Sequence, residues 1–256
     1  MSRRMIVLAA ALAVSSASAA EKGTPLYVTG DVGLTSVVGK KTFGNGRGPT
    51  TPLMQNQNWS GFENKTLLMA FDTRKVAGWS IEKAVMHIYL AKGDLYGIGL
   101  CTVLGDWTEG GALNWVRREG CPSWDFARTP APGADIPPDY YWAFPGSRFH
   151  SVCFSHPAAR YSHAGPRQIR REKTADGRFL HLSFPVDGKL VESLPADLAT
   201  GLVLTDDKGQ VRESYSLIGA ARPYRYNAAE DAWMFTKDVQ DGHLRPWLEV
   251  WGAPTD

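Results

Sequence analysis

Aromatic and basic residues are concentrated in the segment from Ala127 to Gly177. An exposed aromatic ring can stack on the apolar face of a sugar, and a guanidinium group pairs with carboxylate or sulfate oxygens through two parallel hydrogen bonds. The residues predicted to bind a ligand in this way are Tyr140, Trp142, Arg148, Tyr161 and Arg170. The local excess of arginine favours an acidic ligand. The alternative is a solvated loop whose aromatic rings pack onto the domain.

The same segment also allows an enzymatic interpretation. In a polysaccharide lyase the substrate carboxylate is neutralised before a base removes the neighbouring proton, and Tyr161 and His163 beside Arg160 could supply these groups. The sequence contains no His-Glu-x-x-His, no Gly-x-Ser-x-Gly and no phosphate-binding loop. We assign no catalytic residue from these patterns, and a polysaccharide lyase or hydrolase stays open as the alternative to a non-catalytic protein.

Trp107 and Glu109 form a second candidate for sugar binding, because an indole face and a carboxylate acceptor lie two residues apart before Gly110-Gly111. A tryptophan at the end of a strand more often closes a corner of the core. We expect this structural role for Trp107.

Three cysteines are present, at positions 101, 121 and 153, so at most one intramolecular disulfide can form. Cys101 and Cys121 flank the Trp107 loop and are the predicted pair. The alternative is that all three are small buried apolar residues.

Metal ligands are not evident. Aspartates in turns could contribute to a structural calcium site, but no dense aspartate loop of the calcium-binding type occurs. These residues are Asp72, Asp94, Asp106, Asp206 and Asp207. We predict no metal ligand and no cofactor, and leave structural calcium unassigned.

The elements that must position these residues are predicted to be strands. Between Ile81 and Leu90, residues of one parity are apolar, which is typical of a strand with one buried face. Further strands are expected at residues 66–72, 97–104, 179–184, 201–205 and 245–251, with an entering strand near residues 34–38 and a short helical turn at 189–194. The strands at 66–72, 81–90 and 97–104 are expected to form an antiparallel meander. Long loops are expected at 127–177 and 220–242.

The composition and the N-terminus narrow the class of protein. A net charge of +2 is too small to favour a nucleic-acid partner. Arg3 and Arg4, an apolar run to Val14 and the small residues up to Ala20 are typical of a secretory signal peptide, and no later segment is apolar enough to span a membrane. We predict a signal peptide at residues 1–20, one β domain at 21–256, and a protein that is secreted, periplasmic or held at the cell surface, with a larger extracellular assembly as a possible context.

Several short patterns together resemble the DNRLRE domain of bacterial extracellular proteins. They are Leu67–Asp72, Ile81–Leu90, Trp107-Thr108-Glu109-Gly110, Gly120–Trp124, Trp142–Gly146, Gly201–Leu204 and Arg245-Pro246-Trp247-Leu248-Glu249-Val250. The resemblance implies a jelly-roll β-sandwich of antiparallel strands that serves as a non-catalytic module and binds carbohydrate, including acidic polysaccharide. The long loops depart from the pattern of the family. A purely structural module of the cell envelope is the third functional hypothesis.

Overall fold

A computed structural model describes residues 22–37, 40–55, 64–95, 97–112, 117–142, 160–206 and 232–255. Within these ranges the chain forms twelve strands, one short α-helix and three single-turn 3₁₀ helices, at Arg74–Val76, Pro138–Tyr140 and Gly242–Leu244. The strands are β1 (Thr24–Val37), β2 (Lys40–Asn45), β3 (Thr50–Gln55), β4 (Asn64–Phe71), β5 (Trp79–Lys92), β6 (Ile98–Val103), β7 (Tyr161–Ala164), β8 (Arg170–Lys173), β9 (Leu180–Val186), β10 (Gly201–Asp206), β11 (Ala232–Phe235) and β12 (Trp247–Pro254). The α-helix is α1 (Gly188–Glu192). The predicted signal peptide lies outside the described residues.

Strand β5 shows how the sequence pattern produces the fold. Residues 84, 86, 88 and 90 are buried, whereas residues 85, 87 and 89 are partly exposed. Successive side chains of a strand point to opposite faces, so the apolar set packs into the core and the other set faces outward. Strands β6 and β10 are buried at every position, which agrees with their mostly apolar sequences; the buried polar residues are Thr102 in β6 and Thr205 and Asp206 in β10.

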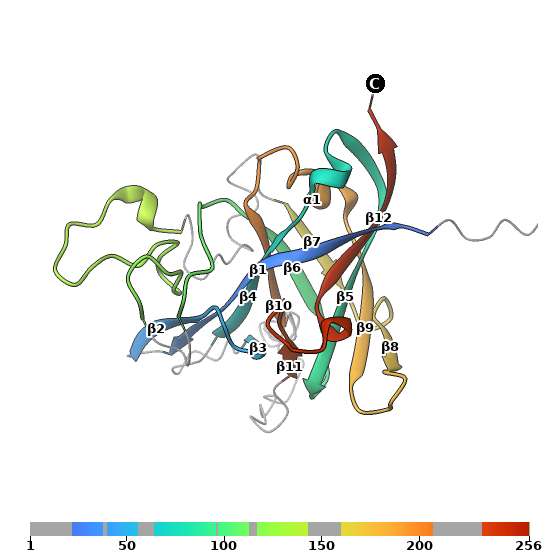
Figure 1. Ribbon diagram of the computed structural model, residues 1–256, viewed down its shortest axis with the longest axis horizontal. Helices are drawn as coiled ribbons and strands as arrows, with labels where there is room; N and C mark the ends of the chain where they lie inside the picture. The colour runs from blue at the N-terminus through green and yellow to red at the C-terminus, as the bar shows by residue number, and fades with distance from the viewer. Residues whose placement is uncertain are drawn as a thin grey trace, which may run out of the picture.

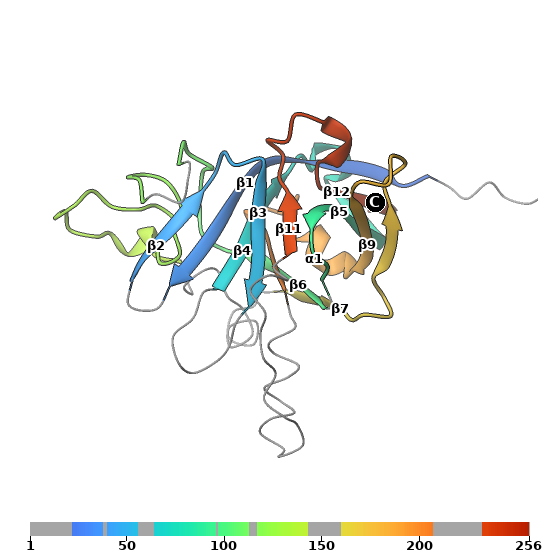
Figure 2. The ribbon, with the colours of Figure 1, turned by 90° about the horizontal axis from the view of Figure 1, so that it is seen from below.

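The strands pair throughout in antiparallel fashion and form two layers that share strands at one side (Figures 1 and 2). Sheet A contains β8, β9, β5, β12 and β11, and sheet B contains β7, β6, β10, β4 and β2. Strand β1 pairs with β12 through its first half and with β4 through its second half, and β3 pairs with both β11 and β4. These two strands therefore join the layers.

Within the described residues the hydrophobic core consists of a main cluster, a second cluster and a small third cluster of Phe235, Val239 and Leu244. The main cluster contains side chains of both sheets, including Met86 and Leu182 of sheet A and Leu202 of sheet B. In the second cluster, Trp124 and Trp142 pack with residues of β1, β4, β6 and β10. The segment from residue 117 to 142, which has little regular structure, therefore covers part of sheet B (Figure 1).

The predicted meander is wrong. Strand β4 pairs with β1, β3 and β10, whereas β5 pairs with β9, β11 and β12, and β6 pairs with β10 and β7. Consecutive strands thus alternate between sheets B, A and B. The connection from β4 to β5 and the connection from β5 to β6 therefore both cross between the layers. A buried apolar strand has the same sequence pattern in either layer, so the pattern could not predict these crossings.

The all-β class and the antiparallel strands are confirmed, and the paired layers are consistent with a β-sandwich. The helical turn near residue 189 is also confirmed as α1, whose first turn is capped by Asp187. The jelly-roll connection stays a prediction. No helix within the described ranges is long and apolar enough to cross a membrane.

Candidate functional site

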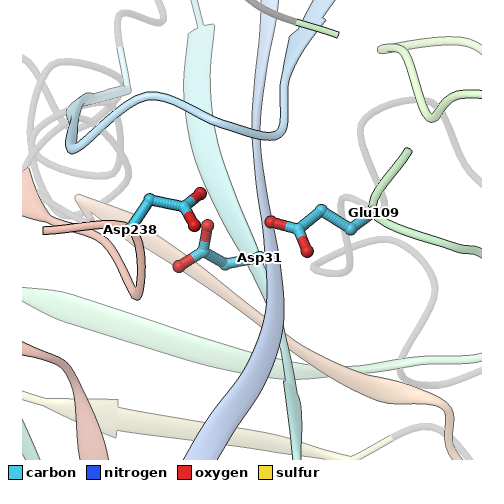
Figure 3. A group of neighbouring side chains, drawn as sticks. All are labelled: Asp31, Glu109 and Asp238. Carbon is cyan, nitrogen blue, oxygen red and sulfur yellow. The ribbon is translucent and has the colours of Figure 1, made fainter. Parts of the chain in front are cut away.

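Three carboxylates from distant parts of the sequence converge beside the middle of β1 (Figure 3). Asp31 belongs to β1, Glu109 follows β6, and Asp238 follows β11. One oxygen of each carboxylate lies within 4.8 Å of the others. We call these three residues the acidic cluster.

Glycines allow the Glu109 segment to approach the neighbouring chain closely. A Cβ on Gly46 would lie 2.6 Å from the carbonyl oxygen of Glu109, and a Cβ on Gly110 would lie 2.4 Å from Cys121 Sγ. Gly110 also has a φ of +67°, a conformation that disfavours other residues. The Gly-Gly pair after Glu109 thus fixes where the carboxylate is presented.

The segment after β11 is fixed by hydrogen bonds to the segment before β3. The Thr236 hydroxyl donates to the carbonyl of Gly48 at 2.5 Å, and the Thr236 backbone N–H donates to the carbonyl of Pro49 at 3.1 Å. These bonds place Lys237 and Asp238 beside Asp31 in the middle of β1.

Lys237 contacts all three carboxylates. Its Nζ lies 2.7 Å from Glu109 Oε1 and 2.8 Å from Asp238 Oδ1, and its backbone N–H donates to Asp31 Oδ2 at 2.6 Å. One lysine therefore joins three segments and neutralises part of their negative charge.

Burial changes the acidity of this group. Asp31 is only 1% exposed, and its burial raises the pKa of its carboxyl from 3.8 to about 7, against the hydrogen bond from the Lys237 backbone. Burial also raises the pKa of Glu109, against the ion pair with Lys237. Burial alone would lower the pKa of Lys237, but its bonds to Asp238 and Glu109 outweigh this effect and raise it.

An open pocket of about 750 Å³ lies above the acidic cluster and is lined by Arg47, Glu109, Gly110, Gly111, Lys237 and Asp238. Arg47 is exposed, and its guanidinium forms no ion pair or hydrogen bond with the part of the chain that the structure describes. Nearby, Arg118 Nη1 donates to the carbonyl of Gly111 at 2.9 Å. The pocket is therefore polar, with carboxylate acceptors and one uncommitted cation.

The acidic cluster could hold a metal ion, since its three carboxylates offer the oxygen ligands that calcium prefers. The Lys237 ammonium lies against two of these carboxylates, so an ion would have to displace it. The cluster contains none of the aspartates considered from the sequence. Of those, Asp72 pairs with Arg74 and Asp94 with Arg171, while Asp106 lies 3.8 Å from Arg128.

The residues predicted to bind a ligand do not form one site. Tyr140 and Trp142 belong to the 117–142 segment, whereas Arg170 lies on β8 at the opposite end of the molecule in both views (Figures 1 and 2). Tyr161, on β7, is 36% exposed, and Arg148 lies outside the described residues. Among the described residues, β7 and β8 thus separate Tyr161 and Arg170 from Tyr140 and Trp142, and binding by each of these residues stays a prediction.

Trp142 is a core residue rather than an exposed platform. It is 5% exposed, packs in the second cluster, and its Nε1–H donates to the Ser123 carbonyl at 2.7 Å. Arg170, in turn, forms an ion pair with Glu172. Trp107 packs against the same cluster as Trp142, which matches the structural role expected for it, whereas Glu109 does line the pocket.

The predicted disulfide is absent. Cys101 and Cys121 are buried and are not bonded to each other. Cys101 lies on β6 in the second cluster, whereas the thiol of Cys121 packs where Gly110 has no side chain. The alternative role as small buried apolar residues fits both cysteines, which are 2% and 4% exposed. Cys153 lies outside the described residues.

The sequence patterns did not predict four residues of the cluster and the pocket, which are Asp31, Arg47, Lys237 and Asp238. Asp31 and Lys237 are 206 positions apart, so their contact depends on strand pairing that no local pattern reveals. The available signal was an aspartate among the apolar residues of β1, since a buried carboxylate requires a partner.

A second polar group lies on the outer face of sheet A. His87 Nδ1 is 3.0 Å from His181 Nε2, and the His87 ring stacks on Trp247 with centroids 4.0 Å apart. The Tyr89 ring stacks on His181, and Glu249 Oε2 lies 3.5 Å from His87 Nε2. Burial lowers the pKa of His87 to about 4 and also lowers the pKa of His181.

No known protein-family model matches the chain, and no curated protein matches it. The resemblance to the DNRLRE domain therefore stays a prediction, and the function must be argued from the fold and its polar groups.

Proposed function

We propose that the protein binds an acidic polysaccharide without cleaving it, and that the pocket beside Arg47 receives the acidic sugar. The observation that carries the proposal is the uncommitted guanidinium of Arg47 on the wall of an open polar pocket. Other cations near the pocket are already engaged, because Lys237 pairs with Glu109 and Asp238 and Arg118 bonds to a backbone carbonyl. An incoming carboxylate or sulfate group would therefore meet Arg47 first.

The remaining lining suits the rest of a sugar ring. Glu109 and Asp238 can accept hydrogen bonds from hydroxyl groups, and Gly110 and Gly111 leave backbone groups accessible at the same wall. A pocket that holds both carboxylates and a guanidinium should select an acidic sugar over a simple anion. The sugar offers hydroxyl donors to the carboxylates and an anionic group to the guanidinium, whereas the carboxylates would repel a simple anion. The secretory signal predicted from residues 1–20 favours an extracellular polymer as the ligand.

Hydrolysis is the second candidate. Two carboxyl groups with raised pKa, Asp31 and Glu109, are the kind of pair that supplies a proton donor in glycosidases. Against it, Asp31 is buried and does not line the pocket, and Lys237 holds the other two carboxylates. The arrangement supports binding better than proton transfer to a bound sugar.

Binding to a panel of polysaccharides tests the proposal. The panel contains a polymer of uronic acid, a sulfated polysaccharide and a neutral polymer of matched length, and retention is measured by affinity electrophoresis at two salt concentrations. We expect retention by at least one acidic polymer, weakening with salt, and none by the neutral polymer. Absence of retention by every acidic polymer would reject the proposal and favour a structural envelope module. Shorter or unsaturated products in the same samples would replace it with catalysis.

A further inference from the structure

His87 and His181 meet on the outer face of sheet A because of the register of β5 and β9. Tyr89 is paired with His181, and His87, two residues earlier in β5, is paired with Ser183. Met86, Ile88 and Leu182 alternate with these residues and are buried in the core, so the two histidines belong to the opposite face. Strand β12 brings Trp247 opposite His87, with Glu249 two residues further along (Figure 1).

The two imidazoles face each other through nitrogen atoms. His87 Nδ1 and His181 Nε2 are 3.0 Å apart, and the rings lie within 16° of parallel with centroids 5.2 Å apart. Only one of these nitrogens can carry a hydrogen if they share a hydrogen bond. The ring of His87 stacks on the ring of Trp247, whose plane differs from it by 6°, and it can turn within its own plane without losing this contact.

The other nitrogen of His87 indicates which one carries the hydrogen. His87 Nε2 is buried and has no hydrogen-bond partner among the described residues, and the carboxylate of Glu249 is 3.5 Å away. A hydrogen on Nε2 would lie beside this carboxylate without a hydrogen bond to it in the present arrangement, and Nδ1 would then present a lone pair to His181. A carboxylate behind a histidine in this way is the common arrangement in metal sites, where it orients the ring.

We propose that His87 Nδ1 and His181 Nε2 are the two protein ligands of a site for a divalent transition-metal ion, with Cu²⁺ the preferred ion and Glu249 the residue that positions His87. Two nitrogens that bind one ion at about 2.0 Å and at a right angle lie about 2.8 Å apart, compared with 3.0 Å between His87 Nδ1 and His181 Nε2 in this structure. The ion replaces the shared hydrogen, and the rings turn so that both lone pairs point at it.

The surroundings of the pair agree with a bound cation. Glu249 on β12 and Glu172, which is paired with His181 across β8 and β9, are the nearby carboxylates. Arg170 opposes them but forms an ion pair with Glu172. Imidazole ligands favour copper, nickel and zinc, whereas the oxygen-only acidic cluster beside Lys237 suits calcium, so the two groups differ in the ions they prefer.

Copper binding is the test, measured by calorimetry and electron paramagnetic resonance on the full chain. We expect one tightly bound Cu²⁺ whose spectrum shows coupling to imidazole nitrogen. His181→Gln should abolish this site, and Glu249→Gln should weaken it by roughly tenfold or more. The control His163→Gln, which removes an exposed histidine of β7, should bind as the unchanged protein does.

Circular dichroism will show whether each variant folds. If a variant does not fold, nuclear magnetic resonance of the unchanged protein provides a second measurement. In the unchanged protein, paramagnetic broadening of amide signals by Cu²⁺ should be centred on β5, β9 and β12. Broadening centred elsewhere, absence of a tight site, or unchanged binding in folded His181→Gln would each overturn the proposal.

Discussion

Lys237 Nζ lies 2.7 Å from Glu109 Oε1 and so joins the segment after β11 to the segment after β6. Both side chains are about one fifth exposed, and the same ammonium contacts Asp238. Lys237 thus offsets part of the charge of two carboxylates in the pocket lining and is engaged by them, which leaves Arg47 as the uncommitted cation among the described lining residues.

Replacing Lys237 by methionine should destabilise the fold. The change leaves the carboxylates of the acidic cluster without their cation, while most of the side-chain volume is kept. We expect a loss of about 1–3 kcal/mol in the free energy of unfolding, less than for a fully buried pair because solvent reaches the site. Urea unfolding measures it. Lys75→Met, an exposed lysine in the turn at Arg74–Val76, is the control and should change stability by less than about 0.5 kcal/mol.

The raised pKa of Asp31 predicts how stability depends on pH. Because its pKa is about 7 in the folded protein and 3.8 is its ordinary value, the folded state holds a proton between these pH values and the unfolded state does not. The contribution of Asp31 to stability is therefore present below pH 4 and is lost as the pH rises toward 7. Glu109, Asp238 and Lys237 are the charged groups around it.

Asp31→Asn removes this titration while keeping an acceptor for the Lys237 backbone. Free energies of unfolding should fall between pH 4 and 7 more steeply in the unchanged protein than in the variant, with a difference on the order of a few kcal/mol. Parallel curves for the two proteins would show that Asp31 does not titrate in this range.

Gly110→Ala tests the close approach that presents Glu109. The new Cβ would lie 2.4 Å from Cys121 Sγ in addition to the cost of a positive φ. Gly120→Ala is the matched control, because Gly120 has a φ of +73° but no heavy atom within 4 Å of the added Cβ. Thermal unfolding should show a loss of about 1 kcal/mol for the control and roughly 2–4 kcal/mol for Gly110→Ala. Equal losses would argue against the contact.

Trp142 should matter for stability and not for ligand affinity. Its burial in the second cluster and its bond to Ser123 predict a loss of about 3–5 kcal/mol for Trp142→Ala. Trp142→Phe, which loses the hydrogen bond and part of the ring, should cost about 1–2 kcal/mol and remain folded. The affinity of the folded Phe variant for an acidic polysaccharide should equal that of the unchanged protein; a tenfold loss would restore Trp142 as a binding residue.

The sequence predicted the strands whose apolar pattern is long or regular. Strand β5 follows from alternation, and β4, β6, β9, β10 and β12 follow from apolar runs. Strands β2, β7, β8 and β11 were not predicted: β2, β7 and β8 lack an apolar run, and β7 and β11 pair with strands far along the chain. β8 carries four charged residues in succession and is a strand only because β9 supplies its hydrogen bonds.

The candidate site was predictable only in part. Glu109 was recognised as an acceptor because it lies in a glycine-rich turn beside a tryptophan. Asp31, Arg47 and Lys237 come from β1, the β2–β3 connection and the segment after β11, and they meet only through strand register. The local sequence does not indicate contacts between such distant residues. Conversely, the aromatic and basic residues that are close in sequence are separated in the fold by β7 and β8.

The affinity of Arg47→Gln for the best-retained acidic polysaccharide tests the central claim most directly. Arg167→Gln, an exposed arginine in the turn between β7 and β8, removes the same charge away from the pocket and is the matched control. A charge-assisted hydrogen bond contributes about 1.5–3 kcal/mol, so dissociation constants from calorimetry should rise roughly 10- to 100-fold for Arg47→Gln and change little for Arg167→Gln. Unchanged affinity in Arg47→Gln, or the same loss in both variants, would contradict the assignment of the pocket.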